Sequence, residues 1–420
     1  MDKTAVTGAT AGRPHAYPFA GSYEGCPGLG LDPKYARLRE NEPAARVLTP
    51  EGDLAVLVTR YDDACRVLAR PAEFSREHVN VAGDALRDGM RDEAFLTEIE
   101  GERHRAQRNL IEGYFTAAGA ERLRVRARRV TDELVERMAA AVPPVDLVEA
   151  LALPLPIAII CDVLGIPDDD QGQFSDWARA FLGLRSRSRG KDQEASEAAG
   201  AAMYHYMQIG LAEHRANPDD SLLTALAVAE NPTVDEHTRI LLAIGTLVAG
   251  FETTANTIAG QAYTLLYHYP DLWRQLAERP ETIPSAVEEL LRWIPVDARD
   301  GMARGATRDV VLAGSVLPEG SAVLVARGAA NRDPRRFDDP ERLDLRRRPN
   351  PHLAFGYGPH RCPGEHMARM ALQVALTGLV SRFPDLRPAV SESALRWNRS
   401  TMRGLRSLPV TWGKRVSLPS

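Results

Sequence analysis

Phe355-Gly356-Tyr357-Gly358-Pro359-His360-Arg361-Cys362-Pro363-Gly364 is the stretch that decides the fold, and the rest of the chain is interpreted outward from it. Its glycines allow sharp turns and close approach to a flat ligand, because without a Cβ they adopt positive φ at little cost. Apolar residues recur at helical spacing from Met367 to Leu379, so the stretch opens a helix. Cys362 therefore lies just before a helix N-terminus, where the backbone N–H groups favour a thiolate.

A single thiolate restricts the kind of metal site that this stretch could form. No second cysteine or histidine stands at zinc-site spacing, and zinc sites need three or four protein ligands. One thiolate suits the axial bond that a protein gives to haem iron, because the porphyrin supplies four other ligands. The alternative is a buried cysteine in a Gly/Pro-rich turn.

The same stretch resembles the haem-binding loop of the cytochrome P450 superfamily. It matches at every defining position, which are Phe355, Gly358, His360, Cys362 and Gly364. The resemblance spans roughly residues 44–412 and implies a mainly α fold with a small β region, a helical triangular prism enclosing haem. It implies heme b (iron protoporphyrin IX) as cofactor, with Cys362 as the metal ligand. Ala249, Phe355, His360 and Gly364 would contact the haem.

Composition narrows the class of protein. The chain has 420 residues, 44% hydrophobic and 26% charged, with a net charge of −5. This acidic balance disfavours nucleic-acid binding, which requires basic excess. Its four cysteines, Cys26, Cys65, Cys161 and Cys362, fit no disulfide framework or CxxC metal site. A reducing cytoplasm suits them.

Neither the N-terminal segment nor the most apolar run of the sequence suggests a membrane protein. Residues 1–17 have no apolar core, so they are neither signal peptide nor anchor, and we expect residues 1–20 to be a disordered segment ahead of a single domain, 21–420. The apolar run from Ile240 to Phe251 is shorter than the roughly 20 residues of a spanning helix. By resemblance, the chain is of the soluble bacterial type.

The first third of the chain predicts a hairpin, a helix and a long loop. Two β-branched runs between Ala44 and Arg60 flank a turn, and residues 61–68 have a helical pattern. Residues 74–99 lack a clear apolar face, and long loops inside compact domains are usually functional or disordered. By resemblance this loop closes over substrate, with Val79, Asn80 and Val81 as contacts.

His104 and Arg108 are predicted to share one helix face, since they stand four residues apart. Two donors on one face suit a pair of anionic propionates, whereas the alternative is a solvated basic face. The family places a His-x-x-x-Arg pair here for haem propionates. Arg304 is a third propionate ligand by resemblance.

The middle of the chain is predicted to be helical. An apolar segment, 145–164, ends at a Gly165 stop, and we interpret Asp168-Asp169-Asp170 as a solvated helix N-terminus rather than a metal site. Two helical patterns follow in 173–215, around a basic surface linker at 185–191.

One long buried helix is predicted from about Val234 to Tyr269, because no turn signal occurs before Pro270. Gly245, Ala249, Glu252, Thr253 and Asn256 fall on one face of it. The segment from Ala249 to Thr254 resembles the oxygen-activation motif of the same family. That resemblance implies that Thr253 hydrogen-bonds dioxygen or a nearby water, while Glu252 exchanges protons with solvent. The alternative is a helix bend with a satisfied acid.

The last third of the chain contains an ion pair expected to act as a clamp on the cysteine loop, a predicted hairpin and further substrate contacts. Glu289 and Arg292 form the family's Glu-x-x-Arg pair, expected to hold the cysteine loop. Val310–Leu312 and Ala322–Val325 predict a hairpin around a turn at 314–320. Substrate contacts are expected from Gly245, Val248, Val296 and Met402.

The resemblance implies haem-thiolate monooxygenation, by hydroxylation or epoxidation, in secondary-metabolite or antibiotic biosynthesis. Electrons would come from a ferredoxin and an NAD(P)H-dependent ferredoxin reductase. A basic patch of Arg105, Arg108, Arg346, Arg347, Arg348 and Arg361 could steer the ferredoxin. The substrate, free or carrier-protein-bound, is open, and a monomer is expected. Oxidative coupling, desaturation or peroxide-driven oxidation by the same fold remains an alternative, as does a non-catalytic haem-thiolate sensor or ligand-binding protein.

Overall fold

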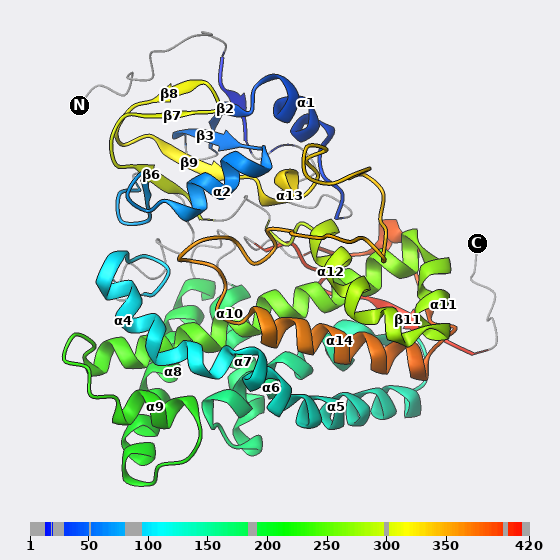
Figure 1. The fold of residues 1–420 in the computed structure, drawn as a ribbon. Coiled ribbons are helices and arrows are strands. Elements are labelled where there is room, and N and C mark those ends of the chain that lie inside the picture. The colour runs from blue at the N-terminus through cyan, green and yellow to red at the C-terminus, as the bar shows by residue number, and fades with distance from the viewer. Residues whose placement is uncertain are drawn as a thin grey trace.

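The structure is a computed structural model that describes residues 13–17, 19, 29–49, 52–79, 95–183, 191–297, 302–397 and 402–413. A broad helical layer carries a smaller β-rich lobe on one side (Figure 1). The helices are α1 (Pro33–Asn41), α2 (Tyr61–Ala69), α4 (Gly101–Ile111), α5 (Ala117–Ala140), α6 (Pro154–Leu164), α7 (Gln171–Gly183), α8 (Lys191–Ala216), α9 (Leu222–Val228), α10 (Glu236–Tyr263), α11 (Pro270–Glu278), α12 (Ile283–Trp293), α13 (Arg327–Ala330) and α14 (Glu365–Arg382).

The strands form three sheets. One six-stranded sheet has the order β1 (His15–Ala16), β2 (Ala44–Leu48), β3 (Leu54–Val58), β9 (Ala322–Val325), β6 (Arg304–Ala306) and β4 (Phe74–Ser75). A second contains β10 (Arg387–Pro388), β11 (Pro409–Thr411) and β5 (Val145–Asp146), and a third pairs β7 (Val310–Leu312) with β8 (Ser315–Leu317). The predicted hairpin at 44–60 and the helix after it are confirmed, since β2 pairs antiparallel with β3 and α2 follows.

Helix α10 runs through the centre of the helical layer and packs against α6, α8 and α14. It is capped by Asp235, whose side chain accepts from the Thr238 N–H, and it continues into a π-helical turn, η4 (Thr264–His268). Within the described residues, Glu236–His268 is the helix long and apolar enough to span a membrane, and 61% of its apolar window is buried inside the protein. The predicted long buried helix is confirmed.

The predicted hairpin between 310–312 and 322–325 is wrong. Ala313 (φ 50°) and Gly314 (φ 81°) make a two-residue turn, so β7 pairs with β8 instead. Positive φ at both turn positions matches the twist of a tight hairpin. After Gly320, the chain continues into β9, which belongs to the six-stranded sheet and pairs in parallel with β3.

The predicted disordered segment 1–20 extends too far. His15 and Ala16 pair in parallel with β2, while Tyr17 and Phe19 are buried in the β-rich lobe. Alternating large apolar groups next to a strand explain this order, because they cover the inner face of the sheet. The other residues of that prediction lie outside the described ranges.

The helical predictions for the middle of the chain hold where they can be compared. Gly165 ends α6 in the left-handed region (φ 85°), and the two helices at 173–215 are α7 and α8. Asp168–Asp170 form a 3₁₀ turn ahead of α7, where Asp168 pairs with Arg126 and Asp170 accepts from Tyr206 at 2.6 Å. Except for Lys191, the basic linker lies outside the described residues.

Candidate functional site

The Cys362 loop is held by its own backbone. Gly356 and Gly358 have φ of 73° and 75°, which L side chains rarely adopt, and a Cβ on Gly358 would meet Leu68 O at 2.6 Å. The Cys362 N–H donates to Phe355 O at 2.9 Å, and Gly364 is the N-cap of α14. The loop therefore presents Cys362 directly ahead of the helix, as the sequence predicted.

The electrostatics of Cys362 differ from the simple helix-terminus expectation. Burial raises the pKa of the Cys362 thiol above its ordinary value, and it outweighs the Gly364 N–H that lowers the pKa. Thiolate ligands must be deprotonated to bind a metal, and a bound cation supplies the charge that burial opposes. The Gly364 N–H therefore acts in the direction that the sequence predicted, but burial has the larger effect on the Cys362 thiol.

A cavity of about 110 Å³ lies over the sulfur. Cys362 lines it from the cysteine loop, and Thr253 lines it from α10. Its walls are mostly apolar, and the complete lining is Ile111, Phe115, Pro156, Ile159, Ile160, Thr246, Ala249, Gly250, Thr253, Thr254, Cys362, Pro363, Gly364, Met367, Ala368 and Ala371. The structure thus brings together Ala249, Thr253, Cys362 and Gly364 of the predicted site.

Helix α10 supplies the polar groups of its own wall of the cavity. Thr253 Oγ1 donates to Ala249 O at 2.8 Å, and Thr257 Oγ1 donates to Thr253 O at 2.7 Å. Such bonds compete with the helical ladder. Asn256 Nδ2, one turn beyond Thr253, is buried with no hydrogen-bond partner in the part of the chain that is described. Glu252 is half-buried and does not line the cavity.

A polar cluster connects the start of α4 to the cysteine loop. His360 Nε2 bonds Glu100 Oε2 at 2.9 Å, and the His104 and His360 rings lie 4.3 Å apart between centroids. Arg304 is buried and its Nη1 lies 3.6 Å from Glu100 Oε1. Two of the predicted haem contacts, His360 and Arg304, therefore meet at Glu100, which the sequence analysis missed, and His104 joins them through the His360 ring.

His104 is an orphaned buried donor. Its Nε2 has no partner among the described residues, and only 3% of the residue is exposed. Burial, together with the charges of His360 and Arg108, lowers the pKa of His104 to about 4. A buried imidazole nitrogen without a partner is costly. This residue set, an orphaned donor beside a buried guanidinium and a lone cysteine, fits a flat cofactor that carries anionic side chains.

Arg108 contacts the cysteine loop itself. Its Nη1 donates to Arg361 O at 2.8 Å and to Pro359 O at 3.2 Å, while its Nε pairs with Glu112 at 3.3 Å. Arg108 therefore holds the loop from outside. Its predicted contact with a propionate stays a prediction.

The clamp pair is completely buried. Arg292 Nη2 and Nε donate to the two oxygens of Glu289 at 2.7 and 2.8 Å, and both side chains are 0% exposed. The same carboxylate accepts from Arg347, Asn350 and the Asp344 N–H. Phe355, at the start of the cysteine loop, lies under Arg369, whose guanidinium carbon is 4.5 Å from the ring centroid.

The structure does not gather the predicted substrate contacts around the cavity. Val79 is buried in the β-rich lobe, and a Cβ on Gly245 would face the Phe95 ring at 3.6 Å. Val296 and Met402 lie side by side, since Val296 O accepts from Arg403 N and Asp297 forms a β-bridge with Met402. Val248 is buried on α10. Asn80 and Val81 lie outside the described residues.

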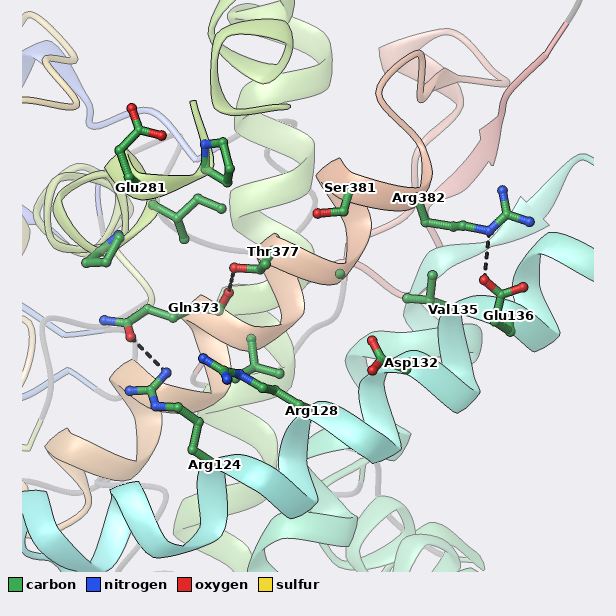
Figure 2. A pocket seen from close by; sticks show the side chains of 15 residues that line it. Arg124, Arg128, Asp132, Val135, Glu136, Glu281, Gln373, Thr377, Ser381 and Arg382 are labelled. Atoms are coloured by element: carbon green, nitrogen blue, oxygen red, sulfur yellow. Dashed lines mark hydrogen bonds and ion pairs between the residues drawn. The ribbon is translucent and has the colours of Figure 1, made fainter. Parts of the chain in front are cut away.

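A larger groove of about 570 Å³ lies elsewhere, between α5, the start of α12 and the C-terminal half of α14. Figure 2 shows its charged rim, where Arg124 bonds Gln373 at 3.2 Å and Arg382 pairs with Glu136 at 2.8 Å. Cys362 does not line it. The candidate site is therefore the smaller cavity.

Comparisons with known proteins agree with this geometry. The model of the family described as Cytochrome P450 matches residues 281–388. Mycinamicin IV hydroxylase/epoxidase of Micromonospora griseorubida is 41% identical, over 96% of this chain and 100% of that protein. Nocardicin C N-oxygenase of Nocardia uniformis subsp. tsuyamanensis is 38% identical, over 94% and 98%. A solved mutant of the mixed-function P450 MycG in complex with mycinamicin IV is 40% identical, with a TM-score of 0.85 over 95% of this chain and 100% of that one.

Proposed function

This chain belongs to the cytochrome P450 family, and from that premise we propose that Cys362 is the protein ligand of a heme b that oxygenates a secondary metabolite. The chain is a haem monooxygenase of secondary metabolism, as its relatives are. The observation that carries the proposal for the site is that Cys362 of the cysteine loop and Thr253 of α10 line the same cavity. Bound haem supplies the redox chemistry, which uses dioxygen and two electrons to oxygenate the substrate and release water.

In this proposal, residues at the cavity and in the neighbouring polar cluster would hold the cofactor. Cys362 would bind the iron, and Ala249, Phe355 and Gly364 would contact the ring. His104, Arg108, Arg304 and His360 would hold the propionates. The orphaned Nε2 of His104 and the burial of Arg304 support this assignment, because both groups gain from an anionic partner.

Thr253 and Glu252 handle protons. Thr253 Oγ1 donates its own proton to Ala249 O, so its oxygen can accept a hydrogen bond at the cavity wall and can donate only when that bond opens, while half-buried Glu252 next to it exchanges protons with solvent. Proton transfer from a positioned side chain contributes about 10²- to 10⁴-fold in rate. Glu289 and Arg292 have a structural role, holding the segment ahead of the cysteine loop.

The substrate is proposed as a secondary metabolite, hydroxylated or epoxidised, either free or carrier-protein-bound. Mycinamicin IV hydroxylase/epoxidase and nocardicin C N-oxygenase are similarly related to this chain and act on different compounds. Val79, Asn80, Val81, Gly245, Val248, Val296 and Met402 stay the proposed contacts. The adjacency of Val296 and Met402 supports a shared wall.

We further propose that a ferredoxin and its NAD(P)H-dependent reductase deliver electrons, and that the protein is a cytoplasmic monomer with one domain, which starts before residue 21 because β1 belongs to the six-stranded sheet. Strands β3 and β9 pair although far apart in sequence, as do β5 and β11, which supports one domain.

An optical titration tests the function. Purified protein is titrated with natural-product scaffolds while the Soret band is followed. A shift with one scaffold identifies a substrate class, and a Soret band that no free compound moves directs the search to carrier-bound substrates. Absence of haem absorption would refute the proposal, and Cys362→Ala is the control that must lose the thiolate spectrum.

A further inference from the structure

Glu100, the N-cap residue ahead of α4, and two residues of the helix itself contact the cysteine loop. Glu100 bonds His360, His104 lies against the His360 ring, and Arg108 donates to the carbonyls of Pro359 and Arg361. The spacing of four residues places His104 and Arg108 on one face of the helix, and Glu100 lies at its N-terminal end. The first of the three is a carboxylate, although the cofactor proposed for this site is itself anionic.

We propose that Glu100 is a positioning residue, which fixes His360 and Arg304 relative to each other so that both can hold the haem propionates. The proposal rests on the haem-binding function given above. Glu100 does not itself contact substrate or cofactor. It acts by orienting His360 and Arg304, the two donors that it contacts.

Both oxygens of Glu100 are engaged. Oε2 bonds His360 Nε2 at 2.9 Å, and Oε1 accepts the Arg76 N–H at 3.0 Å and lies 3.6 Å from Arg304 Nη1. Arg304 Nη1 also donates to Phe74 O at 3.3 Å. The carboxylate therefore links the cysteine loop, through His360, to the end of β4 at Arg76 and to β6 at Arg304. These segments lie far from one another in the sequence.

The position of Glu100 in α4 supports this role. Glu100 is the N-cap residue, yet its side chain accepts no hydrogen bond from the first turn of the helix. An N-cap side chain normally accepts from the N2 or N3 amide, which stabilises the helix by about 1 kcal/mol. Here the side chain is directed to His360 instead, so helix capping does not explain it.

The Glu100 side chain stays ionised although it is mostly buried. Its side chain is 11% exposed. Burial raises the pKa of Glu100, but hydrogen bonds from His360 and the Arg76 N–H and the charges of His360 and Arg304 together hold it below its ordinary value. A buried anion persists only when it is paired and hydrogen-bonded. A negative charge near the haem also favours the oxidised iron, so Glu100 should lower the reduction potential.

Two variants separate geometry from charge. Glu100→Gln keeps the side-chain length and one acceptor oxygen but removes the charge, whereas Glu100→Ala removes both. Glu102→Gln is the matched control, because Glu102 is two residues away on α4, is 94% exposed and pairs only with Arg105 in the described structure. Haem transfer to apomyoglobin and the reduction potential are measured on each holoprotein.

We expect Glu100→Ala to release haem about tenfold faster than wild type, as is typical when a residue that orients a ligand-binding side chain is removed. Glu100→Gln should release haem more slowly than Glu100→Ala, and both should shift the potential upward. In a His360→Ala background, Glu100→Gln should add less than it does alone, because the pair is coupled.

The proposal is overturned if both Glu100 variants match Glu102→Gln within about twofold in haem transfer, or if Glu100→Gln and His360→Ala effects are additive. A wild-type protein that binds no haem, or lacks a thiolate spectrum, refutes the proposed function instead. The Glu100→Gln result decides the question if Glu100→Ala does not fold.

Discussion

The two sides of the cavity are built differently. On the cysteine side, the loop is fixed by backbone hydrogen bonds and by Arg108, and the segment ahead of it is held by a buried clamp whose acceptor, Glu289, receives five donor groups. On the α10 side, Thr253 bonds only its own helix among the interactions described, and Asn256 Nδ2 has no partner in that part of the chain. A fully satisfied network fixes geometry, whereas groups bonded only to their own helix stay available for chemistry.

Breaking the clamp should produce the largest effect. Glu289→Ala leaves Arg292 and Arg347 facing a buried gap, and removing one partner of a buried ion pair costs about 3–5 kcal/mol. Urea unfolding should show this loss. Glu136→Ala, which breaks the exposed pair with Arg382, is the control and should cost at most about 1 kcal/mol. Equal losses for the two variants would contradict a special role for the clamp.

The pH dependence of the protein without haem should report His104. Its folded pKa of about 4 lies below the ordinary 6.5, so between these values the unfolded chain binds more protons. Stability contributed by neutral His104 is therefore full above pH 6.5 and is lost as the pH falls toward 4, by up to about 3 kcal/mol. Urea unfolding of His104→Gln should show a shallower decline over this range.

Exposed His205 supplies the control for that experiment. His205→Gln should retain the wild-type decline, because its side chain lies on the surface of α8. A decline in His104→Gln as steep as in wild type would mean that other groups dominate the acid sensitivity of the cysteine side.

Thr253→Ala tests the α10 side of the cavity. We expect stability to change by only about 0.5 kcal/mol, because the lost bond is to the helix's own Ala249 carbonyl. Product formed per electron consumed should fall by roughly 10², with peroxide released instead, since a hydroxyl positioned for proton transfer is lost. Stopped assays of product and peroxide with a ferredoxin system measure both.

Thr257→Ala is the matched control. Thr257 makes the same kind of bond, to Thr253 O, one turn further along α10 and does not line the cavity. It should therefore keep coupling close to wild type. Equal uncoupling in both variants would assign the effect to helix geometry and not to the Thr253 hydroxyl.

How well the sequence predicted each part depends on the distance between interacting residues along the chain. Cys362, the polar face of α10 and the Glu289–Arg292 pair lie within single segments, so local spacing was enough. Glu100 meets His360 across 260 residues, and Arg347 meets Glu289 across 58. The sequence around each of these residues does not show whether its side chain contacts a distant partner or solvent.

The β-rich lobe shows the same limit. The sequence predicted the hairpin of β2 and β3, which are neighbours, but it missed β8 and placed β9 beside β7. A three-residue strand such as Ser315–Leu317 carries too little alternation to be recognised, and β9 is positioned by its neighbours β3 and β6. Of the substrate contacts, Val79 faces the interior of this lobe, which a loop assignment could not show.

Arg346 and Arg347 are adjacent residues at the surface of the cysteine side, and they differ in burial. The predicted ferredoxin patch included both, but Arg347 is only 9% exposed and bonds Glu289 together with the carbonyls of Asp338, Asp339 and Arg342, whereas Arg346 is exposed. Arg347→Ala should cost about 1–3 kcal/mol in urea unfolding, and Arg346→Ala within about 0.5 kcal/mol.

Because Arg347 belongs to the clamp, charge reversal there would change stability and electron transfer together. Arg346→Glu isolates the surface charge, and we expect it to weaken the salt dependence of ferredoxin-supported reduction while unfolding stays unchanged. An unchanged salt dependence would remove Arg346 from the docking surface. If Arg346→Glu lost as much stability as Arg347→Ala, Arg346 would also be part of the clamp, although the hydrogen bonds of the structure include only Arg347.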